Sequence, residues 1–80
     1  MNDILWNSRV LGAMQAHACL TQDELNVMKD WSLGKEPEET AFRFSMSKRT
    51  VESIRTRLRV KYDGIQEYAG LPPRVLPKRR

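Results

Sequence analysis

The segment from Ser47 to Tyr62 holds the side chains of this 80-residue chain that are best suited to binding chemistry. Guanidinium groups, amines and short hydroxyls are interspersed there, and such groups donate hydrogen bonds to phosphate oxygens and to base edges. On a helix that turns about 100° per residue, the apolar residues gather on one side: Val51, Ile54, Leu58 and Tyr62. The other side and its edges carry polar residues: Arg49, Glu52, Ser53, Thr56, Arg57 and Arg59. We therefore expect a helix with one buried side and one side able to meet an anionic surface.

Charge is divided unevenly along the chain. Residues 1–40 carry three basic and seven acidic side chains, and residues 41–80 carry eleven basic and three acidic ones, so the halves have net charges of −4 and +8. A positive field concentrated in one half favours a polyanionic partner. Charge alone does not distinguish DNA from RNA, acidic lipid or an acidic protein.

The elements that must position this segment are helices, because no stretch alternates with a period of two. Apolar residues at helical spacing predict a first helix over residues 3–19. The capping pair Thr21 and Glu24 begins a second helix, and Gly34 ends it. Pro37 begins a third, which reaches about Phe44. A fourth helix covers residues 47–62, and a short fifth helix covers residues 65–71 beyond Asp63 and Gly64. The expected fold class is all-α.

Several function classes find no support in the residues. There is no paired acid and base, no glycine-rich phosphate loop and no metal-ligand cluster, so we expect no enzyme, no cofactor and no small-molecule ligand. The single cysteine, Cys19, excludes an internal disulfide and is expected to be a small buried thiol. No apolar run approaches the roughly 20 residues that cross a bilayer. We expect no membrane association and a cytoplasmic location.

Two short helices joined by a three-residue connection, residues 45–47, predict a helix-turn-helix whose second helix fits the major groove of DNA. Short side chains such as Ser53 and Thr56 let the helix approach base edges, while arginines reach the phosphates. The competing interpretation of such a charge run is a solvated helix surface. The basic helix, the short connection and the compact preceding helix together favour DNA.

Residues 20–71 also resemble the LuxR/GerE-type DNA-binding domain, and similarly region 4 of sigma factors. The stretch SKRTVESIRTRLRVKY is the most specific part. The other matching positions are: Leu20, Thr21, Glu24, Val27, Met28, Gly34, Glu39, Ala41, Phe44 and Met46. The chain departs from the family pattern at several positions, including an added residue near Asp63: Thr40, Phe42, Ser45 and Ile54. Ser45 replaces a turn glycine, so a residue with a side chain would take up positive φ there.

The resemblance implies that residues around the start of the fourth helix meet phosphates and that outward positions meet bases. Together with the helical geometry, it assigns DNA base contacts to four residues: Arg49, Glu52, Ser53 and Thr56. It assigns phosphate contacts to five: Ser47, Lys48, Thr50, Arg57 and Arg59. A glutamate in the groove weakens binding to phosphate, but it can accept a hydrogen bond from a cytosine amine.

The predicted organisation is an N-terminal helical arm over residues 1–19, the DNA-binding domain over 20–71 and a basic, disordered tail over 72–80. The predicted function is a stand-alone transcriptional regulator. Four residues are candidates for contacts with a second copy or another protein: Trp6, Val10, Met14 and Phe42. The alternative function is a protein-binding regulator that pairs with a transcription factor or RNA polymerase through the apolar N-terminal helix.

Overall fold

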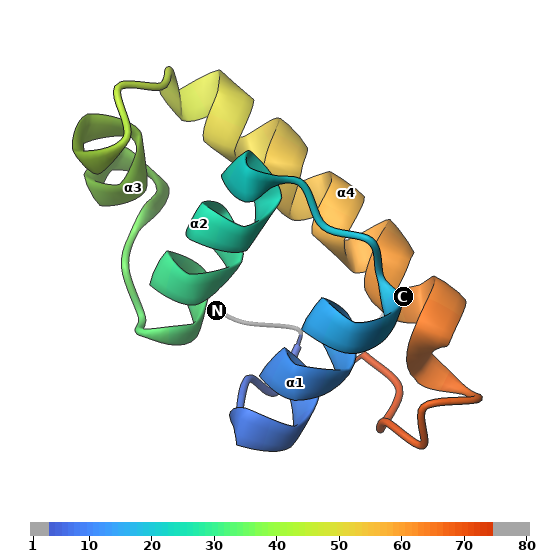
Figure 1. Cartoon of the computed structure of the whole chain (residues 1–80). Coiled ribbons are helices and arrows are strands. Elements are labelled where there is room, and N and C mark those ends of the chain that lie inside the picture. Colours follow the sequence, from blue (N-terminus) through green and yellow to red (C-terminus); the bar gives the residue numbers. More distant parts are fainter. Residues whose placement is uncertain (1–3, 75–80) are drawn as a thin grey trace, which may run out of the picture.

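Residues 4–74 are described by the computed structural model, and every regular element among them is a helix. The helices are α1 (Ser8–His17), α2 (Gln22–Ser32), α3 (Pro37–Arg43) and α4 (Lys48–Gln66). The longest, α4, contacts each of the other three, which lie along one side of it (Figure 1). The all-helical class is confirmed. Within residues 4–74, no helix is both long and apolar enough to cross a bilayer.

Side-chain caps set where three of the helices begin. The carboxamide of Asn7 accepts a hydrogen bond from the Val10 amide at 2.9 Å, so α1 starts at Ser8 and the prediction of a start at residue 3 is wrong. At α2, Thr21 and Glu24 form the predicted capping box. At α4, the Ser47 hydroxyl accepts from the Thr50 amide at 3.0 Å, as the sequence predicts.

Residues in the left-handed region end the helices. Gly34 has φ of 83° after α2, and the amide of Lys35 then reaches the Asp30 carbonyl at 3.0 Å. Ser45 has φ of 55° after α3, and the Met46 amide bonds the Ala41 carbonyl at 2.9 Å in the same pattern. Ser45 therefore adopts the glycine-like conformation without being glycine. This hydrogen-bonded turn sets the direction in which α4 leaves α3.

The predicted break after Tyr62 is absent, because α4 continues through Asp63 and Gly64 to Gln66. The separate helix expected at residues 65–71 is therefore wrong, and the chain turns instead at Gly70, whose φ is 69°. A glycine inside a helix costs only about 1 kcal/mol relative to alanine. Ile65, which is 5% exposed, lies on the buried side of the continued helix, and its burial offsets that cost.

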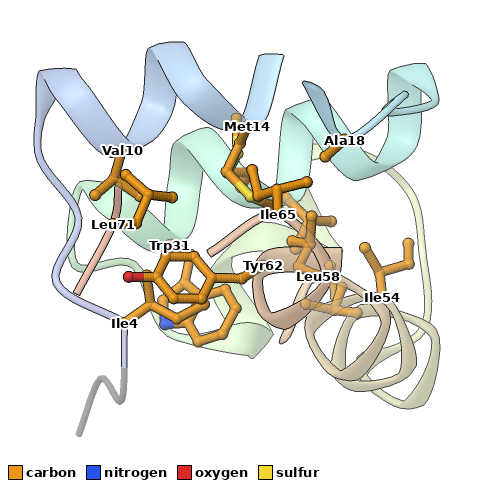
Figure 2. Packing of buried hydrophobic residues seen from close by; sticks show 14 residues of the cluster. Ile4, Val10, Met14, Ala18, Trp31, Ile54, Leu58, Tyr62, Ile65 and Leu71 are labelled. Carbon is orange, nitrogen blue, oxygen red and sulfur yellow. The ribbon is translucent and has the colours of Figure 1, made fainter. Parts of the chain in front are cut away.

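One core joins all four helices (Figure 2). Trp31 and Tyr62 are its largest members, and each is 1% exposed. Val10 and Met14 of α1 are 1% and 0% exposed, so these two of the four residues predicted to contact a second chain pack inside their own chain. The N-terminal segment is thus part of the same core as α2 and α4.

The C-terminal segment is also anchored to this core. The Tyr62 hydroxyl donates to the Pro72 carbonyl, and the Gln66 carboxamide donates to the Leu71 carbonyl at 2.6 Å. Arg74 forms two bonds with the Asp63 carboxylate, at 2.9 and 2.8 Å. Residues 72–74, predicted as part of a disordered tail, are therefore held in place; residues 75–80 of that tail lie outside the described residues.

Cys19 is exposed, so the prediction of a buried thiol is wrong. Its φ of 51° places it in the left-handed region just past α1, while its neighbour Ala18 is 7% exposed and fills the core position.

Candidate nucleic-acid interface

The outward strip of α4 is defined here as Arg49, Glu52, Ser53, Thr56 and Val60. All five side chains are exposed, whereas the opposite side of the helix is almost fully buried. The amphipathic pattern therefore predicted the orientation of this helix correctly. The role of the strip in binding bases stays a prediction. Its small central residues leave the helix backbone accessible to a partner, which a strip of long side chains would not allow.

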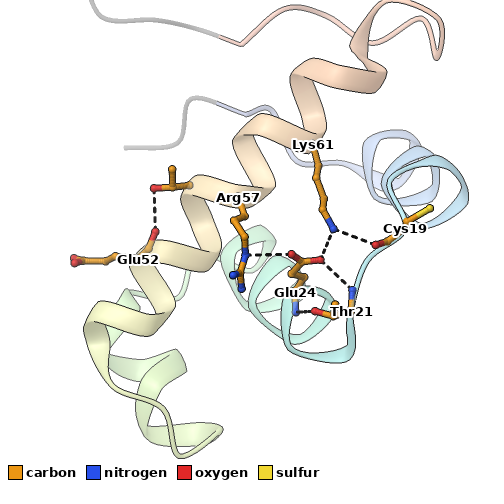
Figure 3. Close-up of polar contacts among 7 residues, drawn as sticks. Cys19, Thr21, Glu24, Glu52, Arg57 and Lys61 are labelled. Carbon is orange, nitrogen blue, oxygen red and sulfur yellow. Dashed lines mark hydrogen bonds and ion pairs between the residues drawn. The ribbon is translucent and has the colours of Figure 1, made fainter.

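The hydroxyl of Thr56 is engaged within the helix. Its Oγ1 donates to the backbone carbonyl of Glu52 at 3.1 Å, one turn earlier (Figure 3). The single hydroxyl hydrogen is therefore used, and Thr56 offers a partner its methyl group and its oxygen lone pairs.

The start of α4 gathers three of the predicted phosphate contacts. The hydroxyls of Ser47 and Thr50 lie 2.9 Å apart, and Ser47 also caps the helix. The Lys48 amine lies 3.1 Å from a Glu38 carboxylate oxygen on α3. A hydrogen bond from its own backbone amide and, second, this contact with Lys48 lower the pKa of Glu38, and the same contact raises the pKa of Lys48. Because both side chains are more than half exposed, the pair is weak and a phosphate can displace it.

A buried carboxylate from α2 holds the middle of α4. The Glu24 side chain is 4% exposed and lies 2.7 Å from the Lys61 amine and 3.3 Å from Arg57 Nε (Figure 3). Lys61 also donates to the Cys19 carbonyl at 3.0 Å. Burial by itself would raise the pKa of Glu24, but bonds from Lys61 and the Thr21 amide, with the charges of Lys61 and Arg57, outweigh it and lower the pKa. The sequence predicted Glu24 as the partner of Thr21 in a capping box, but it gave no sign of the ion pairs with α4.

Two arginines share the ring of Trp31. The guanidinium carbons of Arg55 and Arg59 lie 4.7 and 4.9 Å from the ring centroid, and Trp6 packs edge-on against the same ring at 5.3 Å. Arg55 also donates to the Lys35 carbonyl at 2.8 Å, and burial together with the charge of Arg59 lowers its pKa. Arg55 therefore lies along the core margin.

The predicted phosphate contacts are therefore not equivalent. Arg59 stacks on Trp31 at the margin of the core, and Arg57 is ion-paired but has a 59% exposed side chain. In the sequence, Arg55 and Arg59 are four residues apart on the edge of the helix nearest its apolar side. This spacing is the signal from which their shared stacking on Trp31 could have been predicted.

Phe42 lies on α3. It is 88% exposed, so it does not pack on the first helix. Among the described residues, no group of three histidine, cysteine or acidic side chains is arranged to hold a metal ion.

Comparisons with protein-family models, with curated proteins and with solved structures found no match to this chain.

Proposed function

We propose that this chain is a small transcriptional regulator that binds double-stranded DNA with sequence specificity, inserting α4 into the major groove. In this proposal α3 and α4 are the two helices of a helix-turn-helix similar to that of the LuxR/GerE-type domain. The observation that carries the proposal is the outward strip of α4, where the short hydroxyl side chains of Ser53 and Thr56 are exposed beside Arg49.

Electrostatics support the same partner. Net charge over residues 41–80 is +8, and α4 supplies much of it. Lys48 and Arg57 are paired with Glu38 and Glu24, yet both cations remain more than half exposed on their side chains. Exchanging such a pairing for a DNA phosphate releases counterions from the duplex, which makes binding strongly dependent on salt.

The test compares duplex binding at two salt concentrations for the parent and for the double variant Arg49→Ala, Arg57→Ala. We expect weaker binding and a shallower salt dependence, with the slope reduced by about 0.9 for each phosphate that the variant no longer neutralises. The matched control is Arg9→Ala, Lys29→Ala, which removes the same charge from exposed positions on α1 and α2. If both double variants lose affinity equally, or the parent binds no better than an unrelated basic protein, the proposal is wrong.

Contacts to bases and contacts to phosphates can be distinguished by changing different side chains of α4. Changing Ser53 or Thr56 should alter which sequence is preferred, whereas changing Lys48 should weaken all sequences alike. Identical behaviour of the two sets would contradict insertion of α4 in the groove.

A second candidate function is contact with another protein, and Phe42 is the observation that favours it. Phe42 has the largest exposed fraction, 88%, among the large apolar side chains of residues 4–74, and a partner that covers it removes this apolar surface from water. The apolar side of α1 no longer favours this role, since Val10 and Met14 are buried. Sedimentation of the parent and of Phe42→Ser tests a homodimer. A monomeric parent at high micromolar concentration, with one chain per DNA site, would exclude it.

A further inference from the structure

Glu52 is a negative charge placed in the middle of a surface that otherwise suits a polyanion. It is exposed, and among residues 4–74 it takes part in no ion pair. Its charge raises the pKa of Lys48 and acts in the same direction on Arg55, but both side chains make their contacts elsewhere: Lys48 with Glu38, and Arg55 with Trp31 and the Lys35 carbonyl. A carboxylate that is in no ion pair at this place repels phosphates and lowers affinity for every duplex.

Around the axis of α4, the Glu52 side chain lies at nearly the same angle as the residues that are expected to face bases. At about 100° per residue, it lies about 60° from Arg49 and about 40° from Thr56 around α4. If α4 lies in the major groove with this strip facing the bases, the Glu52 carboxylate reaches the base edges. There a hydrogen bond to one particular base offsets the affinity that is lost by repelling phosphates.

Glu52 and Thr56 together form a patch that only accepts hydrogen bonds. An ionised carboxylate has no hydrogen to donate, and the Thr56 hydroxyl already donates its hydrogen to the Glu52 carbonyl at 3.1 Å. In the major groove, guanine and thymine present acceptors, which such a patch repels. Adenine presents an amine beside the acceptor N7, whereas cytosine presents its amine with no acceptor on its own edge.

We propose that Glu52 is the specificity-determining residue of this interface and selects a cytosine through the exocyclic amine of that base, with the Thr56 oxygen presenting a second acceptor beside it. The inference rests on the proposed DNA-binding function. It adds to that function the identity of one base pair in the target and the residue that reads it.

The experiment is selection of bound duplexes from a random pool, followed by measured affinities for the selected site and its single-base variants. The parent should require C·G at one position. Glu52→Gln should change that preference to A·T, because glutamine pairs with both N6 and N7 of adenine, and the ratio of the two affinities should change about tenfold or more. Glu52→Ala should accept several bases there.

The matched control is Glu67→Gln, which makes the same charge change at the exposed end of α4. Glu67→Gln should slightly raise the affinity for all duplexes and leave the base preference at this position unchanged. If Glu52→Gln behaves like Glu67→Gln while the parent still selects a defined site, Glu52 reads no base, and DNA binding itself stands. If the parent selects no site, sequence-specific binding and the role of Glu52 are both refuted. Thermal melting of each variant verifies that it is folded.

Discussion

Replacing Glu24 by glutamine should destabilise the fold far more than the same replacement at Glu38. Glu24 lies on α2 with its side chain 4% exposed, and it bonds Lys61 at 2.7 Å and the Thr21 amide at 3.0 Å. Glutamine has almost the same shape, so the change removes charge and leaves packing intact. The variant gives up the charge-assisted part of an interaction that joins α2 to α4.

The size of the expected loss in stability depends on how exposed the ion-pair partners of Glu24 are. A hydrogen bond to a charged group contributes about 1.5–3 kcal/mol, and breaking a fully buried ion pair costs about 3–5 kcal/mol. Here Lys61 and Arg57 are 29% and 59% exposed, so water can solvate them when the carboxylate is gone. We therefore expect a loss of about 2 kcal/mol, which lowers Tm by roughly 10 °C in a domain of this size.

The pH dependence of folding stability provides a second test of the role of Glu24. The folded pKa of Glu24 lies below its ordinary value of 4.5, so the unfolded chain takes up this proton first as pH falls. Stability from the Glu24 charge is fully present above that ordinary value and is lost as pH falls through the lower, folded pKa. The parent should lose stability over this acidic range, and Glu24→Gln should lose less.

The assay is urea unfolding followed by circular dichroism at neutral and acidic pH, with Glu38→Gln as the matched control. Glu38 pairs with Lys48 at 3.1 Å, but both side chains are more than half exposed, so little change is expected. Equal stability of the Glu24 and Glu38 variants at neutral pH would refute this account of the buried carboxylate.

Three further changes test the packing and the turns. Met14→Ala should lower the free energy of unfolding by about 2–4 kcal/mol because Met14 is fully buried, whereas Gln15→Ala on the exposed side of α1 should leave it unchanged. Equal thermal melting of the two variants would contradict a core role for α1. Ser45→Gly should stabilise by about 0.5–1 kcal/mol, since glycine adopts φ of 55° without strain, and an unchanged midpoint in urea would show that Ser45 bears no strain. Tyr62→Phe should cost about 1 kcal/mol and speed proteolysis of the C-terminal segment, because the variant cannot bond the Pro72 carbonyl; cleavage at the parent rate would mean that this bond does not hold the segment.

Local signals predicted much of this fold. The capping residues Thr21 and Ser47 and the terminator Gly34 act within one helical turn, so their effect can be read without knowing the rest of the chain. The buried side of α4 was predicted for a similar reason, because helical periodicity separates Val51 and Leu58 from the polar residues. The break expected at Gly64 failed because burial of Ile65, a tertiary effect, outweighs a weak local preference.

The sequence alone determined that the chain is helical, which side of α4 is polar and where the positive charge lies, since these depend on neighbours within a few positions. Only the tertiary structure decided which of those charges are engaged. The pairing of Lys61 with Glu24 joins residues 37 positions apart, and the stacking of Arg59 on Trp31 likewise requires α2 to pack against α4. Contacts of this kind depend on how the helices dock, and no local pattern specifies that. Docking also turned the apolar side of α1 into core and brought Glu38 of α3 into an ion pair with Lys48 of α4.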